Sequence, residues 1–266
     1  MPAVTYETLR DAIRAHRPAV LVTVVEGPGT GDKLLLVQDD DSRIETSGSL
    51  ADPDLDRVVR RDAEAALAGG TTSVRRYGAH GEANEDAVMV FFESYAPSPR
   101  LVIFGAVDFT AALVRVAKVL GYHVTVCDAR EVFATRARFP LADEVVVDWP
   151  HRLLERVGSS LGPRDAVCVL THDVKFDVPA IVSALRTKVG YLGAMGSRRT
   201  TEQRAERLRA EGVTDDEMAR LMAPIGLDLG ARTPEETAVA ICAEIIAQRT
   251  GAAAPSLRSA DGPIHR

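Results

Sequence analysis

The sequence predicts an α/β protein in which a parallel sheet covered by helices follows a smaller N-terminal α+β domain. From Arg100 onward, short and nearly continuous apolar segments alternate with amphipathic ones, which is typical of parallel strands buried on both faces. Before residue 95, two apolar segments are separated by a loop rich in Gly and Pro, which indicates a hairpin. Residues 96–99 contain two prolines and form a short, stiff connector. We therefore expect domains at 1–95 and 100–250.

In the first domain the hydrophobic pattern favours two helices and three strands. In chain order we expect a helix at 6–16, strands at 19–27 and 33–39, a helix at 55–70 and a strand at 87–94. An acidic run, DDDSRIETSGSLADPDLD, separates the hairpin from the second helix. That helix has a period near 3.6 and ends at a glycine.

In the second domain strands and helices alternate regularly. We expect strands at 100–105, 123–128, 144–148, 166–171 and 189–196, with helices at 109–121, 130–139, 151–158 and 178–188. Right-handed crossovers place the carboxyl ends of all such strands on one edge of the sheet, where ligands bind. Residues 251–266 have no apolar period, and we expect them to be disordered.

The composition excludes several classes of protein. The net charge of −6 gives no support to nucleic-acid binding, which needs a basic surface. No apolar run approaches the roughly 20 residues that span a bilayer, and the first residues lack the features of a secretory signal. The three cysteines lie in apolar segments without Cys-x-x-Cys spacing, which indicates buried free thiols. We expect a cytoplasmic protein.

The first strand of the second domain leads into a modified glycine loop. In G-x-G-x-x-G the second glycine lets the backbone approach a pyrophosphate at the helix N-terminus. Here Val107 replaces that glycine after Gly105. Asp108 would repel a phosphate and is placed to cap the helix. Asp128, 23 residues after Gly105, has the position of a ribose-binding acid, or is only a turn residue. An ordinary NAD(P) site is thus disfavoured.

The fourth strand of this domain ends in a polar cluster. Thr171, His172 and Asp173 follow it at the carboxyl edge, with Asp177 one helical turn onward. His and Asp side chains can transfer protons or bind a metal. In the alternative interpretation Thr171 or Asp173 caps the next helix and His172 packs in the core.

The fifth strand runs into an expected anion site. Gly193 and Gly196 permit close approach to the backbone, and Ser197 is a natural N-cap. Arg198 and Arg199 follow in the first helical turn, where cations oppose the macrodipole. This arrangement is favourable if backbone amides and guanidinium groups hold an anion there. Otherwise the two arginines are simply solvated.

The last loop precedes a strong helix start. Thr233-Pro234-Glu235-Glu236 is a capping box with proline at the first helical position, and Thr214 to Glu217 forms another. Gly226, Asp228 and Gly230 make a tight loop before the first of these. Helix chemistry does not explain that loop, so we include its three residues among the candidate ligand-binding residues.

Residues 100–249 resemble the XdhC/CoxI family of accessory factors for molybdenum hydroxylases such as xanthine dehydrogenase. The resemblance is carried by LTHD with a following Asp, GYLGAMGSRRT and APIGLDLGARTPEE, in that order. It implies a Rossmann-like C-terminal domain and a homodimer. It also implies that the chain binds molybdenum cofactor (molybdopterin), protects it during sulfuration and delivers it to the apo-hydroxylase. The implied partners are that hydroxylase and a cysteine desulfurase.

The chain departs from the family at three motifs. Gly105-Ala106-Val107-Asp108 replaces Gly-Ala-Gly-His, and Ser47-Gly48-Ser49-Leu50 replaces Ser-Gly-Gly-Cys. A later Cys-Gly-Gly is replaced by residues 83–90, ANEDAVMV. Because the N-terminal domain contains no cysteine, sulfur relay through one is excluded, although thiolates suit molybdenum and sulfur chemistry. These departures indicate a divergent member with reduced or altered activity.

Three hypotheses remain on the sequence alone. The first is a carrier or maturation factor for molybdenum cofactor that binds without catalytic turnover. The second is an NAD(P)-dependent oxidoreductase, and the third is an interaction module that has lost its ligand. The fold does not discriminate among them, because one architecture hosts many functions. The sequence identifies no catalytic residue and no set of metal ligands.

Overall fold

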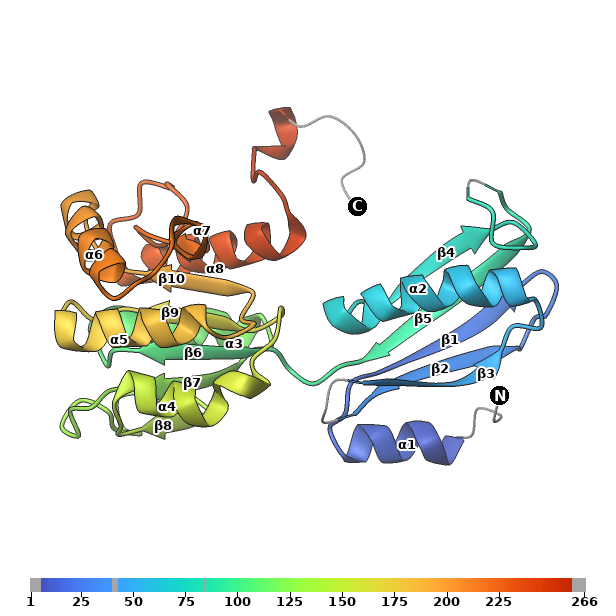
Figure 1. The fold of residues 1–266 in the computed structure, drawn as a ribbon, viewed down its shortest axis with the longest axis horizontal. Coiled ribbons are helices and arrows are strands. Elements are labelled where there is room, and N and C mark those ends of the chain that lie inside the picture. The colour runs from blue at the N-terminus through green and yellow to red at the C-terminus, as the bar shows by residue number, and fades with distance from the viewer. Residues whose placement is uncertain (1–5, 40–42, 84, 260–266) are drawn as a thin grey trace. The chain divides into compact units, whose positions relative to one another are not determined.

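A computed structural model describes residues 6–39, 43–83 and 85–259. The chain divides into two compact units, Met1–Pro97 and Ser98–Arg266 (Figure 1). The α/β prediction is confirmed, since one unit contains an antiparallel sheet and the other a parallel sheet.

The N-terminal unit is built on a five-stranded antiparallel sheet with the order β3-β2-β1-β5-β4. Its strands are β1 (Ala19–Glu26), β2 (Lys33–Gln38), β3 (Ile44–Ser49), β4 (Ser73–Tyr77) and β5 (Val88–Tyr95). The predicted hairpin of β1 and β2 is confirmed. The edge strands β3 and β4 were not predicted, because both are polar and largely accessible to solvent and so lack an apolar alternation. Residues 40–42 of the acidic run and Asn84 of the segment 83–90 lie outside the described residues.

The two helices of this unit cover opposite faces of its sheet (Figure 1). α1 (Tyr6–Arg14) packs Ala12 against one face. α2 (Pro53–Gly69) packs Leu55 and Val59 against the other. Asp52 caps α2 by accepting hydrogen bonds from two amides, and Gly70 ends it in the left-handed conformation. Both predicted helices are therefore confirmed.

The C-terminal unit contains six parallel strands in the order β11-β10-β9-β6-β7-β8. Numbered from β6, this is the order 3-2-1-4-5-6 of doubly wound dinucleotide-binding domains. The strands are β6 (Arg100–Phe104), β7 (His123–Cys127), β8 (Glu144–Val146), β9 (Ala166–Val169), β10 (Tyr191–Ala194) and β11 (Leu221–Met222). The first five were predicted. β11 was missed because it has only two residues.

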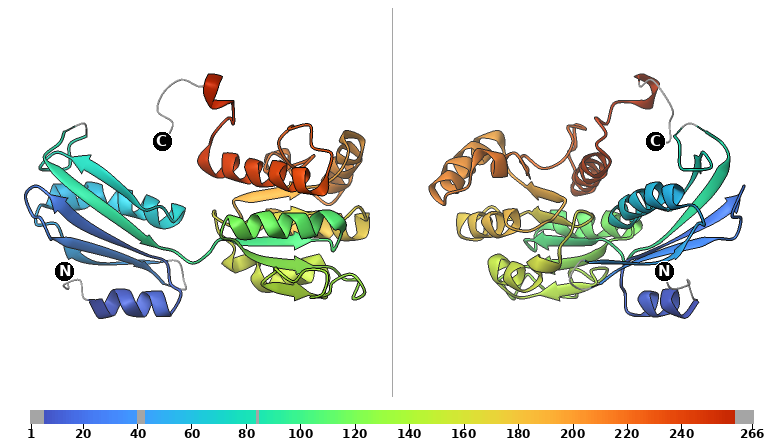
Figure 2. Two further views of the ribbon diagram at one scale, coloured as in Figure 1. Left: turned by 180° about the vertical axis from the view of Figure 1, so that it is seen from behind. Right: turned by 45° about the vertical axis from the view of Figure 1, so that its right-hand side comes forward.

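Helices cover both faces of the parallel sheet (Figure 2). α3 (Asp108–Val119) and α8 (Pro234–Thr250) pack on one face. On the other face lie α4 (Pro150–Val157), α5 (Val174–Leu185) and α6 (Arg198–Ala210). Short helical turns complete the unit: η1 (Gly158–Ser160), α7 (Asp215–Met218) and η2 (Leu257–Ser259).

The predicted helix at 130–139 is wrong. This segment forms turns instead. The guanidinium groups of Arg136 and Arg138 donate hydrogen bonds to the carbonyls of Ala142 and Ala106, respectively. These contacts, of which the bond from Arg138 to Ala106 spans 32 residues of sequence, stabilise a non-helical backbone that local propensity did not indicate. In the predicted tail, residues 252–259 are exposed and include η2, while 260–266 lie outside the described residues.

The strand order reverses between β6 and β9, which places their carboxyl ends side by side. Ligands bind at this point in open α/β sheets. Gly105 follows β6 with φ 114°, and a Cβ there would lie 3.0 Å from the Thr171 amide nitrogen and 2.8 Å from the Thr171 Cγ2. Gly105 is therefore needed for the close approach of the two loops.

We expect Gly105→Ala to lower the free energy of unfolding by about 2–5 kcal/mol, because it adds a steric contact to an unfavourable positive φ. Gly121→Ala is the matched control, since Gly121 also has a positive φ (80°) but no atom within 4 Å of the added Cβ. It should cost about 1–2 kcal/mol. Urea unfolding measures both values. Equal losses would contradict the close approach to Thr171.

Candidate functional site

The loops that follow the strands bring nearly all of the predicted site residues to the carboxyl edge of the parallel sheet. These residues are Gly105, Asp108, Asp128, Thr171, His172, Asp173, Gly196, Ser197, Arg198, Arg199, Gly226, Asp228 and Gly230. Gly193 lies inside β10 instead. A Cβ on Gly193 would lie 2.5 Å from the Ile225 side chain, so internal packing explains this glycine.

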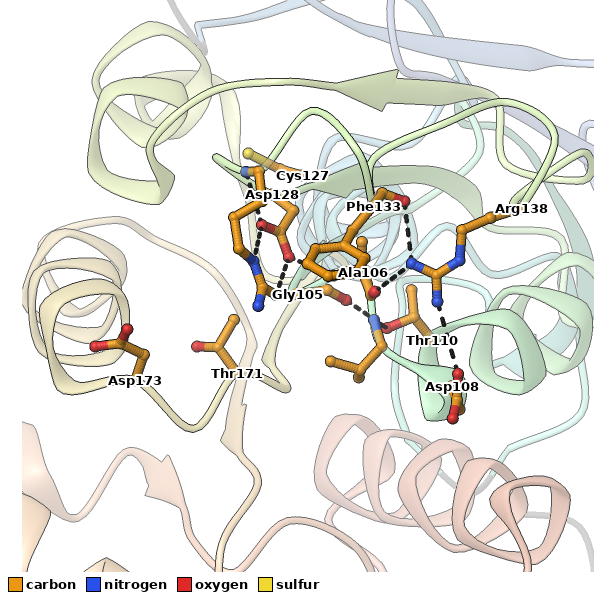
Figure 3. Close-up of polar contacts among 12 residues, drawn as sticks. Gly105, Ala106, Asp108, Thr110, Cys127, Asp128, Phe133, Arg138, Thr171 and Asp173 are labelled. Atoms are coloured by element: carbon orange, nitrogen blue, oxygen red, sulfur yellow. Dashed lines mark hydrogen bonds and ion pairs between the residues drawn. The ribbon is translucent and has the colours of Figure 1, made fainter.

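The backbone polar groups of Gly105 and Ala106 in the first loop are already hydrogen-bonded (Figure 3). The Gly105 amide donates to Cys127 at 2.9 Å, and its carbonyl accepts from the Thr110 hydroxyl. The Ala106 amide donates to Asp128 at 2.8 Å. The Arg138 Nη1 donates to the Ala106 carbonyl at 2.9 Å. A pyrophosphate would have to displace these bonds, in addition to meeting the side chain of Val107.

Asp128 is saturated with hydrogen bonds and is only 3% exposed. Besides the Ala106 amide, it accepts bonds from the Arg130 amide and Nε at 2.9 Å each and from Arg130 Nη2 at 2.7 Å. A carboxylate has about four lone-pair sites, so none remains for the hydroxyls of a ribose. Burial acts to raise the pKa of Asp128, but the hydrogen bonds from Arg130 and Ala106 outweigh it and lower that pKa below its usual value.

Asp108 does not cap α3 as the sequence indicated. Val107 holds the N-cap position without a side-chain hydrogen bond, and Asp108 is the first helical residue. Its side chain is 92% exposed and lies 3.6 Å from Arg138. Arg138 and Arg130 also lie 5.6 Å and 4.5 Å from the centre of the Phe133 ring, respectively. Figure 3 shows the bonds of Arg138 to the carbonyls of Phe133 and Ala106 and its ion pair with Asp108. The charges around the first loop are therefore paired with one another.

The residues after β9 have two different roles: one caps the next helix, and another belongs to a buried cluster. Asp173 is the N-cap of α5 and accepts a hydrogen bond from the Lys175 amide, as predicted. His172 is exposed, so its predicted alternative role in the core is wrong. The Thr171 hydroxyl is buried and donates to Asp177. Burial raises the pKa of Asp177, although hydrogen bonds from Thr171 and Arg204 act in the opposite direction.

Arg204 completes this cluster and was missed at the sequence level. Its Nη2 donates to Asp177 at 3.0 Å and to the Met195 carbonyl at 2.8 Å. The side chains of Arg204 and Asp177 are only 4% and 5% exposed. The segment SRRTTEQRAERLRAEG has four other arginines, so residue type alone does not distinguish the buried one. Its spacing of four from Leu208, which is also buried, was the available signal.

The loop after β10 leads into α6 as predicted. Ser197 is the N-cap and accepts a hydrogen bond from the Thr200 amide at 3.1 Å. Arg198 and Arg199 are exposed in the first turn, which contains no acidic residue. Within the described part of the chain, the amides of Gly196 to Arg199 donate no hydrogen bond. This turn therefore differs from the first loop at the two residues before the helix, because the amides of Ala106 and Val107 have acceptors, whereas those of Gly196 and Ser197 have none in the described part of the chain.

Contacts with α8 explain part of the last loop. The Gly226 amide donates to Glu244 at 2.9 Å, and the Tyr191 hydroxyl donates to the same carboxylate at 2.5 Å. Gly226 has φ 95°, which favours glycine. Asp228 and Gly230 are exposed, and both predicted capping boxes are confirmed at Thr214 and Thr233.

The three cysteines are buried free thiols, as predicted. Burial raises the pKa of Cys127 and of Cys242 to about 12 and also raises that of Cys168, so none is a thiolate at neutral pH. Among the described residues, no group of three or more His, Cys, Asp or Glu could hold a metal ion. No described helix is long and apolar enough to cross a membrane.

We expect Asp128→Asn to lower the free energy of unfolding by about 1–3 kcal/mol at pH 7. Because the folded pKa is depressed, this contribution is complete above the unfolded pKa near 3.9 and is lost as the pH falls through the folded value. The difference between wild type and variant should therefore narrow below about pH 4. Urea unfolding at pH 7 and pH 3 measures it.

Asp216→Asn is the control for this substitution, because Asp216 is exposed in α7. It should change stability by less than about 0.5 kcal/mol at neutral pH. A difference between wild type and Asp128→Asn that stays constant with pH would contradict the ionised hydrogen-bonded carboxylate.

Comparisons with known proteins agree with this architecture. The chain is similar to a probable xanthine dehydrogenase subunit from Bacillus subtilis (strain 168), with 31% identity over 60% of this chain and 46% of that protein. It is also similar to the molybdenum cofactor insertion chaperone PaoD of Escherichia coli (strain K12), with 27% identity over 60% of this chain and 43% of that protein. The chain thus spans less than half the length of these relatives.

The fold is also found in a solved structure. The match to the crystal structure of a xanthine dehydrogenase from Bacillus halodurans includes 92% of this chain and 95% of that chain. Its TM-score is 0.55, and the sequence identity is 21%. The family model described as the XdhC Rossmann domain matches residues 101–245, which are more than half of the chain. The model described as the XdhC and CoxI family matches residues 12–78. The chain therefore belongs to the XdhC/CoxI family.

Proposed function

We propose that this protein is an accessory factor that binds molybdenum cofactor and assists its maturation or its insertion into a xanthine dehydrogenase-type hydroxylase. Family membership and the names of the relatives support a role in molybdenum cofactor maturation. The proposed partners are a cysteine desulfurase and the cofactor-binding chain of a molybdenum hydroxylase. A cytoplasmic homodimer that carries the cofactor without catalytic turnover belongs to the same proposal.

The observation that carries this proposal is the contrast between two loops at the carboxyl edge. The first loop uses its backbone groups internally through Asp128 and Arg138. The turn before α6 has amides without acceptors and two arginines without an acidic neighbour in the first turn. An anionic ligand is therefore favoured at the turn before α6 and disfavoured at the first loop.

The chemistry of molybdenum cofactor fits that contrast. Its pterin carries a phosphate monoester and a dithiolene that supplies two sulfur ligands to the metal. Ser197, Arg198 and Arg199 would hold the phosphate through amides and guanidinium groups. The three thiols are protonated and buried, so the sulfur of a maturing cofactor has to come from a partner protein. This is why we include a cysteine desulfurase in the proposal.

We expect the purified protein to retain freshly released molybdenum cofactor through anaerobic gel filtration, with pterin and molybdenum in the protein peak. The paired variant Arg198→Ala/Arg199→Ala should weaken retention about tenfold or more, because it removes two cations that face the phosphate. The control is Arg207→Ala/Arg209→Ala, which removes two exposed arginines at the other end of α6. Equal retention by both variants, or an empty wild-type peak, would sink the proposal.

The competing hypothesis is an NAD(P)-dependent oxidoreductase. Because Asp128 has no free acceptor and the Ala106 amide is occupied, we expect millimolar NAD or NADP to leave the melting temperature unchanged. A ligand that binds only the folded state must raise it. A dose-dependent rise of several degrees with either nucleotide would favour the oxidoreductase. No stabilisation by nucleotide or by molybdenum cofactor would favour a ligand-free interaction module.

A further inference from the structure

A buried cation of α6 with an unused donor lies against the turn before that helix. The Arg204 side chain is 4% exposed, yet its Nη1 has no hydrogen-bond partner among the described residues. A buried guanidinium nitrogen without an acceptor is unfavourable, because its hydration has been lost without replacement. An acceptor supplied by a ligand would remove that penalty.

The position of Nη1 is fixed by the opposite side of the same guanidinium group. Nη2 donates to Asp177 at 3.0 Å and to the Met195 carbonyl at 2.8 Å. Because the guanidinium group is planar and rigid, these two bonds also orient Nη1. Asp177 is in turn held by the Thr171 hydroxyl. Thr171 and Asp177 are thus positioning residues for Arg204.

Arg204 Nη1 lies close to Gly196, which comes just before the first residues of α6. A Cβ on Gly196 would lie 3.5 Å from Arg204 Nη1 and 3.3 Å from the Thr200 side chain. The amides of Ser197, Arg198 and Arg199 follow directly and lack acceptors in the described part of the chain. The Ser197 hydroxyl accepts from the Thr200 amide and lies 2.9 Å from the Thr200 hydroxyl, so we count only the amide of Ser197 among the donors.

We propose that a phosphate monoester binds at this turn and that Arg204 is one of the residues that bind it. The sequence does not reveal this role, because Arg204 is surrounded by exposed arginines in the same helix. Its oxygens accept hydrogen bonds from the amides of Ser197 to Arg199 and from Arg204 Nη1, while Arg198 and Arg199 add charge. A dianion with three terminal oxygens matches this number of donors better than a carboxylate does. The inference rests on the proposed function only for the identity of the whole ligand. That ligand would be molybdenum cofactor, whose phosphate would occupy this turn.

Inorganic phosphate is the probe, added to the full-length protein at constant ionic strength with NaCl as balance so that screening does not change. Phosphate should raise the melting temperature of the wild type and show binding by titration calorimetry. Gly196→Ala places a methyl group beside Nη1 and should weaken phosphate binding about tenfold or more. Gly212→Ala is its control, because Gly212 also has a positive φ (83°) and nothing lies within 4 Å of that added Cβ.

A second variant tests Arg204 itself. Arg204→Met combined with Asp177→Leu removes both buried charges together, which is tolerated far better than loss of one partner. It too should bind phosphate about tenfold more weakly or worse. Retained binding in Gly196→Ala overturns the proposal, as does absence of binding in the wild type. A third outcome also overturns the proposal: Gly196→Ala loses phosphate binding while the folded Arg204→Met/Asp177→Leu variant binds phosphate fully. Arg204 would then not belong to the site.

The cofactor experiment separates this inference from the proposed function. Phosphate binding that depends on Gly196 and Arg204, without retention of molybdenum cofactor, would support the phosphate site and contradict the proposed function. Cofactor retention that is unchanged in Gly196→Ala and in the paired variant would support the proposed function and contradict the phosphate site.

Discussion

The hydrogen bonds of Asp177 with Thr171 and Arg204 join three segments that are far apart in the sequence. Thr171 follows β9 at the point where the strand order reverses, Asp177 lies in α5, and Arg204 lies in α6. Through Arg204 the cluster also contacts the Met195 carbonyl in the turn before α6. The position of that turn at the carboxyl edge of the sheet therefore depends on one buried ion pair, between Asp177 and Arg204. Removal of either partner alone would leave an uncompensated buried charge.

The first loop shows how a nucleotide-binding architecture can persist without a nucleotide-binding loop. Gly105 is retained because its Cβ would meet Thr171, which is a requirement of the sheet and not of a ligand. The backbone beyond it is tied to Asp128 and Arg138. Asp128 has the position of a ribose-binding acid but stabilises its own loop, because Arg130 occupies both of its oxygens. Packing and internal hydrogen bonds are therefore sufficient to explain Gly105 and Asp128 without a bound nucleotide.

Local signals predicted the sheet and most caps. Ser197, Asp173 and Thr233 each cap a helix within three residues of the amide they bind, so short-range sequence reasoning found them. Two causes account for the errors. The helix expected at 130–139 was lost to carbonyl contacts of Arg136 and Arg138. The edge strands β3 and β4 were missed because they have no apolar period.

The candidate site was predictable only in outline. Parallel strands implied a common carboxyl edge, and the loops after β9 and β10 do meet there. The identity of the buried cation was not predictable, because Arg204 stands among other arginines in one helix. The pairing of Asp128 with Arg130 was also not predictable. An acidic residue at the end of a strand looks the same in the sequence whether its oxygens are free or hydrogen-bonded.

A crystal structure of the protein with molybdenum cofactor, with the metal located by its anomalous scattering, would test the central claim most directly. Our account predicts the cofactor phosphate at the turn before α6, within hydrogen-bonding distance of the amides of Arg198 and Arg199 and of Arg204 Nη1. A phosphate bound at residues 105–107, with the Ala106 amide released from Asp128, would contradict it.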